Sequence, residues 1–393
     1  MINKNRERKL KSVMTPRERV MKSLSFEEAD RVPLAIGGGP YGIVDDLYFR
    51  LLKLLDLGCL AEPFREGHNI SYLDNQLLGK LGTDLRYVYP TISPTSPNQP
   101  GLTAGTFLDA YGQVWKRAFP YYYADRGILA EIHKPDQIDE IVTWPNARDP
   151  RWFRKTKAIA RELREETDFW ITARMVVSHG PYQMACDLRS TEQFMLDLAT
   201  RPELAHALLE RIGDSICSFL DAYIDACGAY IDMIELPGDD YAGNENLIFS
   251  PVMFRKFIQP VIMRMVTRIK THRSDIKVML HSDGAIAKLI PALIECGIDV
   301  IHPLEPLPAT DQVAVKNACL GKVAFLGGID ISHAMPGSNK DVKAEVIRVL
   351  KELAPGGGFI LAPSNHLQAD VPPENVVALF EYARQYGKYP IQI

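Results

Sequence analysis

One unit recurs along the chain: an amphipathic helical pattern, a short apolar run rich in β-branched and aromatic residues, and then Gly, Pro, Asp or Asn. The runs are continuously apolar rather than alternating, which is typical of strands covered on both faces. Eight such strands alternating with helices predict an α/β fold, a parallel (β/α)8 (TIM) barrel, in which one unit uses roughly 200 to more than 400 residues. The runs cover residues 31–39, 83–90, 169–177, 230–240, 277–284, 299–306, 323–330 and 357–366.

The alternation is interrupted between the second and third runs. There "DAYGQVWKRAF" predicts a hairpin with a Tyr-Gly turn, and we expect residues 100–150 to form an excursion over one mouth of the barrel. Residues 1–25 are expected to be an N-terminal helical extension. The prediction is therefore a single domain over residues 1–393.

Helix boundaries are marked by residues with defined terminal roles. Ser250 and Pro251 predict the start of a helix, because Ser accepts from the first free N–H groups and Pro fits the first turn. Pro260 predicts a kink in that helix. Pro372 and Pro373 precede the last predicted helix.

Charge and cysteine usage exclude several classes of protein. The net charge of −4 and the pI of about 6.2 imply no broad basic surface, so nucleic acid is not an expected partner. The first twenty residues are basic but lack an apolar core, and no run reaches the ~18 apolar residues of a membrane-spanning helix, so a cytoplasmic protein without membrane contact is expected. No C-x-x-C pair occurs, and we expect reduced, buried thiols at Cys59, Cys186, Cys217, Cys227, Cys296 and Cys319.

Polar and titratable residues collect at the predicted C-terminal strand ends, where barrels of this kind build their active sites. Because these ends meet on one face, their side chains are expected to converge. Each also has a structural explanation: Asp239 and Asp240 are suited to capping a turn, Asp283 to forming one before Gly284, and Arg174 to pairing with an internal acid. The set, in chain order, is Gly37, Gly38, Gly39, Tyr87, Tyr89, Arg174, Glu235, Asp239, Asp240, His281, Asp283, His302, Glu305, Asp330, Asn365 and His366.

Four blocks carry a resemblance to a known family: "TPRERVMKSLSFEEADRVPLAIGG", "HSDGAIAKLIPALIECGIDVIHPLEP", "FLGGIDISHAMPG" and "LAPGGGFILAPSNHLQADVPPENVVALFEYARQYG". Over residues 15–387 the chain resembles the uroporphyrinogen decarboxylase superfamily. The resemblance implies a (β/α)8 barrel and one of two activities, decarboxylation in haem synthesis or corrinoid-linked methyl transfer.

The chain departs from the decarboxylase pattern at two places. Decarboxylases of the superfamily carry an arginine-rich segment after the first strand, where this chain reads "GGGPYGIVDD" without arginine. They also carry an aspartate at the end of the second strand, where Thr91 falls here, while Asp84 lies at the start of that strand, a structural place. Both departures argue against uroporphyrinogen as substrate, because its carboxylates would meet no guanidinium partners.

The methyltransferases of the superfamily that the chain resembles often bind zinc through a His-x-Cys motif and a later Cys. The chain departs from this pattern. Here "HSD" places Asp283 where the thiolate would be, so a sulfur-rich zinc site is not expected. Two alternatives stay open. One is a harder oxygen and nitrogen site, for zinc or another metal, drawn from Glu235, His281, Asp283, Asp330 and His366. The other is no metal, with the same groups acting as acids, bases and hydrogen-bond partners.

The resemblance to O-demethylase methyltransferases implies an enzyme that moves a methyl group from a small methylated substrate, such as a methoxylated aromatic, to a corrinoid (cobalamin) on a partner protein. His281 and His366 are expected as acids or ligands, and Glu235, Asp240 and Asp330 as ligands or orienting groups. Homodimer formation is left open. The residues expected to bind the substrate are Arg174, Tyr87, Tyr89, Asp239, Asn365 and Gly38.

Two alternatives to methyl transfer remain. A decarboxylase of a different carboxylated substrate would need Arg174 and Arg86 to bind the carboxylate. A non-catalytic corrinoid- or porphyrin-binding protein is disfavoured by the acid-rich strand ends, since buried unpaired acids cost stability. The aromatic stretch "FPYYY" is suited to walling the pocket or meeting the corrinoid protein, or simply to packing the excursion.

Overall fold

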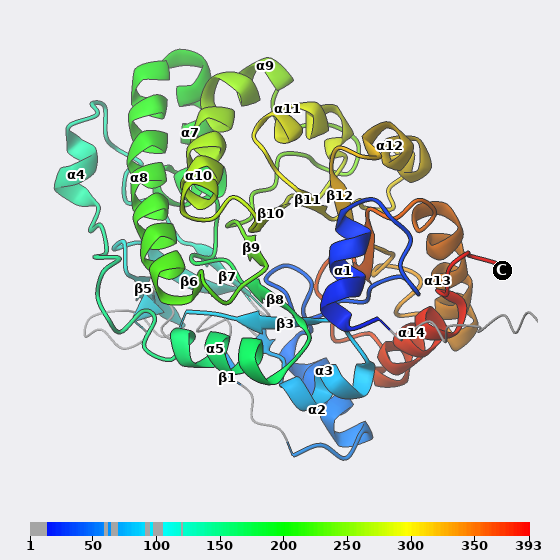
Figure 1. Ribbon diagram of the computed structural model, residues 1–393. Coiled ribbons are helices and arrows are strands. Elements are labelled where there is room, and N and C mark those ends of the chain that lie inside the picture. Colours follow the sequence, from blue (N-terminus) through cyan, green and yellow to red (C-terminus); the bar gives the residue numbers. More distant parts are fainter. Residues whose placement is uncertain (1–13, 59–61, 64–69, 91–94, 97–104, 119–120) are drawn as a thin grey trace, which may run out of the picture.

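The computed structural model describes residues 14–58, 62–63, 70–90, 95–96, 105–118 and 121–393. At its centre lies a seven-stranded sheet in the order β13-β12-β11-β10-β9-β8-β3, with every neighbouring pair parallel. Figure 1 shows this sheet curled inside a ring of helices. The strands are β3 (Leu85–Val88), β8 (Trp170–Ala173), β9 (Met233–Glu235), β10 (Lys277–His281), β11 (Val300–His302), β12 (Ala324–Ile329) and β13 (Phe359–Pro363).

The ends of this sheet are joined by residues 33–35, here called the closing segment. The Ala35 N–H donates to the Leu361 carbonyl of β13 at 2.9 Å, and the Asp84 N–H beside β3 donates to the Leu34 carbonyl at 2.8 Å. The predicted barrel is confirmed, with this segment in the place of the first strand. The predicted strand over residues 31–39 is wrong in extent: Leu34 alone of this run bridges a strand of the barrel, Arg31 bridges Lys388 instead, and Gly37 turns the chain with a φ of +106° that favours glycine.

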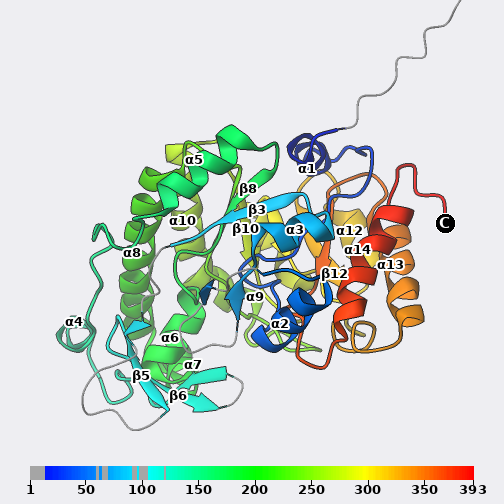
Figure 2. The ribbon, with the colours of Figure 1, turned by 90° about the horizontal axis from the view of Figure 1, so that it is seen from below.

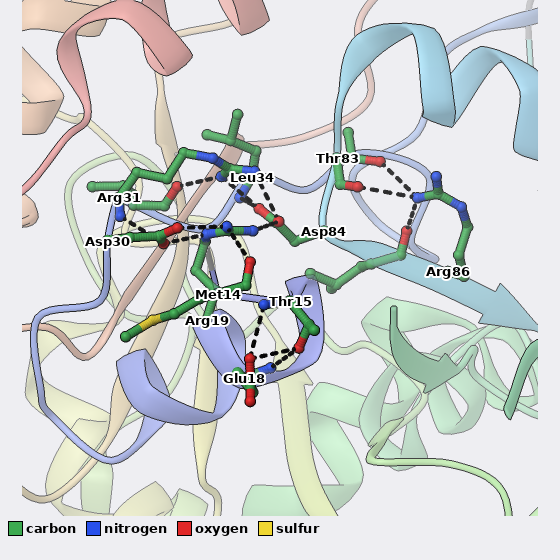
Figure 3. Close-up of polar contacts among 12 residues, drawn as sticks. Met14, Thr15, Glu18, Arg19, Asp30, Arg31, Leu34, Thr83, Asp84 and Arg86 are labelled. Atoms are coloured by element: carbon green, nitrogen blue, oxygen red, sulfur yellow. Dashed lines mark hydrogen bonds and ion pairs between the residues drawn. The ribbon is translucent and has the colours of Figure 1, made fainter. Parts of the chain in front are cut away.

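A buried carboxylate, that of Asp84, holds the closing segment in place (Figure 3). The Asp84 side chain, 1% exposed, pairs with the guanidinium groups of Arg19 and Arg31 and accepts the Leu34 N–H at 2.8 Å. Arg19 also pairs with Asp30 at 2.6 Å. Asp84 therefore has the structural place predicted for it.

The helices that surround the sheet follow the predicted alternation. They are α1 (Pro16–Leu24), α2 (Asp45–Leu54), α3 (Asn75–Leu81), α4 (Gln137–Ile141), α5 (Thr156–Glu166), α6 (Pro181–Arg189), α7 (Thr191–Thr200), α8 (Pro202–Cys227), α9 (Pro251–Met253), α10 (Gln259–His272), α11 (Ile290–Glu295), α12 (Gln312–Cys319), α13 (Asn339–Leu353) and α14 (Pro373–Tyr386), with a 3₁₀ turn at Ile286–Leu289. None of them, in the described part of the chain, combines the length and apolar character needed to cross a bilayer.

The N-terminal helix α1 covers the end of the barrel at which the strands begin. Its Ser23 hydroxyl donates to the Phe359 carbonyl at the start of β13, at 2.8 Å. The Arg17 N–H donates to the Asp168 carbonyl just before β8, also at 2.8 Å. The helical part of the predicted N-terminal extension is thus confirmed over Pro16–Leu24, while residues 1–13 lie outside the described residues.

The excursion between β3 and β8 contains an antiparallel four-stranded sheet in the order β4-β5-β6-β7. The predicted hairpin is confirmed, since β5 pairs with β6 and Asp109 accepts the Tyr111 and Gln113 N–H groups inside the turn, both at 2.9 Å. Figure 2 shows this sheet at the end of the molecule opposite α1. Its strands are β4 (Thr95–Ser96), β5 (Thr106–Asp109), β6 (Val114–Ala118) and β7 (Tyr121–Ala124), and a separate two-stranded sheet pairs β1 (Glu62–Pro63) with β2 (Ser71–Tyr72).

The contacts of the excursion lie with the strand ends. The Tyr121 hydroxyl donates to the Gln368 side chain at 2.7 Å, and the Trp115 ring lies 5.6 Å from the His179 ring. Both contacts involve loops that follow strands of the barrel. Of the "FPYYY" stretch, Phe119 and Pro120 lie outside the described residues. The assignment of residues 1–393 to one domain stays a prediction.

The predicted helix start at Ser250 is confirmed, since its hydroxyl accepts the Met253 N–H at 3.2 Å. A π-helical turn over Phe254–Ile258 then separates α9 from α10, and Pro260 lies in the first turn of α10. The helix is therefore irregular close to Pro260, and the irregularity is a π-helical turn that ends just before the proline. The described cysteines are free and buried as expected, and Cys59 lies outside the described residues.

Candidate functional site

A cavity of about 220 Å³, here called the central cavity, opens at the C-terminal ends of the strands. Its lining comes from the loops after the closing segment, β8, β9, β10 and β13 and from the first turns of α6, so distant parts of the sequence meet as predicted. The described lining residues are Gly39, Pro40, Met175, Ser178, His179, Gln183, Gly238, Asp240, His281, Asp283, Asn365 and His366.

Three residues that can ligate a metal ion lie close together in this cavity. The His281 Nε2 lies 3.7 Å from an Asp283 oxygen and 3.9 Å from an Asp240 oxygen, and one ligand atom from each residue falls within 4.8 Å of the others. The Asp283 Oδ1 is buried and has no hydrogen-bond partner in the described structure. Burial, and next the Asp240 carboxylate, raise the pKa of Asp283 well above its ordinary value. We call these residues the acceptor cluster.

The residue types of the acceptor cluster are suited to a divalent cation. Two carboxylate oxygens and one imidazole nitrogen suit zinc or a harder divalent metal. The separations of 3.7 and 3.9 Å are close to the ~3.4 Å between ligand atoms of a tetrahedral site with ~2.1 Å bonds. The backbone supports the geometry, because the Asp283 N–H donates to the Asp240 Oδ1 at 3.0 Å.

Two residues after β13 complete this side of the cavity. The Asn365 amide donates to the Asp283 Oδ2 and fixes that carboxylate. The Gly42 N–H donates to the His366 Nδ1 at 3.0 Å. An imidazole nitrogen that accepts carries no proton, so the proton of His366 sits on its other ring nitrogen, Nε2. His366 therefore accepts a hydrogen bond through Nδ1 and holds its proton on Nε2.

Glu235, predicted as a catalytic or metal-ligating residue, lies outside the lining of the central cavity. Its side chain is fully buried, and its oxygens accept from the Gly39 N–H and the Tyr41 hydroxyl, each at 2.8 Å. Burial raises its pKa. Glu235 thus supports the loop that forms one wall. Gly38 belongs to the same loop, where an added Cβ would lie 2.0 Å from the Tyr41 ring.

A second, smaller cavity of about 110 Å³ is lined by three of the expected substrate-binding residues, Arg174, Tyr87 and Tyr89. The Arg174 guanidinium lies over the Tyr72 ring at 4.5 Å and donates to the Gly38 carbonyl at 2.8 Å. These residues are therefore grouped together but apart from the acceptor cluster. Arg86 lies elsewhere: its guanidinium donates to the Leu85 carbonyl at 2.7 Å and stacks on Phe169, which gives it a structural place.

The side chains of two further predicted residues accept hydrogen bonds from backbone N–H groups of a helix start or a turn. Asp239 accepts the N–H groups of Tyr182 and Gln183 at the start of α6, at 3.0 and 2.8 Å. Asp330 accepts the Ser332 N–H at 2.7 Å and pairs with the exposed His333 at 3.1 Å. Neither lines the central cavity, so the structure corrects their expected convergence with His281.

The sequence reasoning missed a second imidazole–carboxylate pair in the wall. The His179 Nδ1 lies 2.6 Å from the Asp187 Oδ2, and the Gln183 amide donates to the Asp187 Oδ1 at 3.0 Å. The sequence signal for His179 was its position. With Ser178, it directly follows the predicted strand run at residues 169–177, just as His281 stands at the end of the apolar part of its own run.

Thr91, expected in the place of the decarboxylase aspartate, lies outside the described residues.

Comparison with known proteins agrees with this architecture. The profile of the family described as uroporphyrinogen decarboxylase (URO-D) matches residues 127–386. A uroporphyrinogen decarboxylase of Synechococcus sp. (strain JA-3-3Ab) is 27% identical over 235 residues, which are 58% of this chain and 60% of that protein. One of Actinobacillus pleuropneumoniae serotype 5b is 26% identical over 272 residues, 65% of this chain and 71% of that protein.

Among solved structures, a methyltransferase from Methanosarcina mazei superposes with a TM-score of 0.60 at 18% identity, covering 95% of this chain and 99% of that one. At this identity the similarity concerns the fold. The family profile covers well over half of the chain and ends at the last turn of α14. The chain therefore belongs to the uroporphyrinogen decarboxylase family.

Proposed function

We propose that this protein is a methyltransferase that moves a methyl group from a small methylated compound, such as a methoxylated aromatic, to a corrinoid held by a partner protein. The observation that carries the proposal is the acceptor cluster in a cavity whose described lining contains no arginine or lysine. Such a site is built to hold a cation and to assist a leaving atom, and it offers poor support for a substrate rich in carboxylates.

Charge separates this proposal from the reaction named by the family. A tetrapyrrole with several carboxylates would meet Asp240 and Asp283, and bringing like charges together in a partly buried site is costly. The size of the central cavity points the same way. About 220 Å³ lies below the ~300–1,000 Å³ of sites for drug-sized ligands, which indicates a small substrate.

The residues that line the cavity are suited to stabilising the leaving oxygen of a methyl ether. His281, Asp240 and Asp283 would hold a divalent cation, which would supply a Lewis acid there. The electron pair of the breaking carbon–oxygen bond stays on the oxygen, in a cavity that His366 also lines. A reduced corrinoid on the partner protein would supply the nucleophile for the methyl group.

The test pairs metal analysis of the purified protein with methyl transfer to a reduced corrinoid protein over a panel of methyl donors. We expect a divalent metal at about one per chain and transfer from at least one small methyl ether or amine. Metal-free protein that transfers no methyl group from any donor, with or without added Zn²⁺, would sink the proposal.

Two acid-to-amide variants sharpen this test. Asp283→Asn keeps the size of a ligand but removes its charge, so metal affinity should fall by more than the roughly 10–100-fold that is typical when a partner of a ligand is lost. Asp330→Asn changes an acid that also follows a strand but lies outside the cavity lining. The metal content of Asp330→Asn should equal that of the wild type. Loss of metal in this variant would show that Asp330 is a metal ligand, as the sequence had suggested.

A second candidate function is decarboxylation of a smaller acid. It is favoured by Arg174, whose guanidinium lines the second cavity, since a guanidinium is suited to a carboxylate. Carbon dioxide release from a panel of aromatic and aliphatic acids, lost in Arg174→Met but retained in Asp283→Asn, would favour this function over methyl transfer.

A further inference from the structure

The inner nitrogen of His281 faces a second imidazole. At the ends of β10 and β11, His281 and His302 are partners in the parallel register. Their Nδ1 atoms lie 2.9 Å apart, a hydrogen-bond distance between two nitrogens. Two protons cannot both point into that gap, and without a proton two lone pairs would repel. One proton therefore lies between the rings, and its owner decides what His281 presents to the central cavity.

The other nitrogen of His302 identifies the owner. The His302 Nε2 lies 3.2 Å from the Pro363 carbonyl oxygen at the end of β13. A carbonyl only accepts, so the His302 Nε2 carries a proton. For His302 to own the shared proton as well, it would have to be a cation. Its side chain is fully buried, and no carboxylate hydrogen-bonds to it in the described structure.

A buried cation without an acidic partner is costly, so His302 is neutral and its Nδ1 accepts. The acidic groups lie around His281 instead: Asp240 and Asp283 face it at 3.9 and 3.7 Å. The proton between the rings consequently belongs to the His281 Nδ1.

From this geometry we propose that His302 is a positioning residue: it accepts the His281 Nδ1–H, so that the neutral His281 ring keeps its proton on Nδ1 and presents an unprotonated Nε2 on the side of Asp240 and Asp283. The chain of donors runs from the His281 Nδ1–H to the His302 Nδ1, and from the His302 Nε2–H to the Pro363 carbonyl. His281 is thereby set as an acceptor or metal ligand and not as an N–H donor to the substrate. The part that concerns turnover rests on the proposed function; the tautomer does not.

The direct test is nitrogen NMR of the wild-type protein labelled with ¹⁵N at its histidines, without metal or substrate. Signals are assigned by single histidine variants. We expect the His281 Nδ1 and the His302 Nε2 to show shifts of protonated ring nitrogens, and the His281 Nε2 and His302 Nδ1 those of unprotonated ones. A protonated Nε2 with an unprotonated Nδ1 on His281 overturns the proposal.

Variants at His302 test the cause. His302→Leu removes the acceptor, so His281 should lose its single tautomer, and Zn²⁺ affinity measured by calorimetry should weaken by roughly 10–100-fold. His302→Asn retains a side-chain oxygen that can accept the His281 Nδ1–H, and it should retain the tautomer and most of the affinity. His333→Leu, at a side chain 88% exposed, is the matched control and should change neither.

The outcomes are separable. If His302→Leu folds, keeps the His281 tautomer and binds Zn²⁺ as the wild type does, His302 is not the positioning residue. If it does not fold, the wild-type spectrum and His302→Asn still decide: a reversed wild-type pattern overturns the proposal, and so does loss of the wild-type tautomer in His302→Asn. If the tautomer holds but no donor is demethylated, the proposed function alone fails.

Discussion

At the scale of single residues, the two cavity imidazoles present opposite groups although they are the same residue type. The Gly42 N–H donates to the His366 Nδ1 and so leaves the proton of that ring on Nε2, whereas in our proposal the His302 Nδ1 accepts the His281 Nδ1–H and leaves the His281 Nε2 unprotonated. Sequence could place both histidines at strand ends. It could not assign their roles, because each role depends on a partner that the fold brings from another strand or loop.

The first prediction concerns His281→Ala. Its ring points into a polar cavity, so truncation removes one hydrogen bond to His302 and leaves hydratable space; we expect a loss of unfolding free energy of about 1 kcal/mol. Activity should fall by roughly 10²–10⁴-fold, because the group acts directly on the site. Thermal melting, metal content and methyl-transfer rate are measured on one sample. His333→Ala is the control, and a large drop in melting temperature with a proportionate activity loss would show a core histidine.

At the scale of elements, the strands were predictable and the loops after them only partly so. Every barrel strand from β3 to β13 falls inside its predicted run, since buried parallel strands leave continuous apolar stretches. The loops differ because local chemistry competes for their side chains. Asp330 is captured by the N–H groups of its own turn, and Glu235 by Tyr41 and Gly39. The capture of Glu235 has no signature in the local sequence, because its partners lie on a loop almost 200 residues away.

The second prediction concerns Asp239, which holds the first turn of α6. Burial raises its pKa to about 7, although three donors oppose this. A folded pKa above the unfolded one means that the contribution of this group is full below about pH 4 and is lost as the pH rises through about 7. The unfolding free energy of the wild type, relative to Asp239→Asn, should therefore decrease from pH 5 to pH 8 in urea titrations. An increase over that range would contradict it.

At the scale of the whole molecule, one buried carboxylate helps to close the ring of strands. Asp84 connects α1, the closing segment and the start of β3, through Arg19, Arg31 and the Leu34 N–H. Figure 3 shows these groups converging on it from separate parts of the chain. The sequence placed Asp84 at a structural position, but the arginines that meet it are distant in the chain and could not be inferred.

The third prediction is that Asp84→Ala destabilises the protein by roughly 3–5 kcal/mol, because it leaves Arg19, with a side chain 5% exposed, without that partner. Urea unfolding gives the free energy. The matched control is Asp46→Ala, which removes an exposed pair with Arg50 and should cost no more than ~1 kcal/mol. Equal costs for the two variants would show that Asp84 does not hold the barrel closed.

The fourth prediction is that the protein does not convert uroporphyrinogen to coproporphyrinogen, despite its family. The central cavity measures about 220 Å³, and its described lining offers two carboxylates and no arginine or lysine. Chromatography of the porphyrins formed after oxidation is the measurement. A rate on the order of 1 per second, typical of enzymes, would refute the proposed substrate class.

The contact between Ser23 and Phe359 has a consequence for how the protein is made. These residues are 336 positions apart in the sequence. At roughly 5–20 residues per second, a ribosome needs on the order of 15–70 s to produce the second after the first. During that time α1 and the closing segment lack the strand that completes them, and the edges of the growing sheet stay open. We therefore expect the nascent chain to depend on chaperones until β13 emerges.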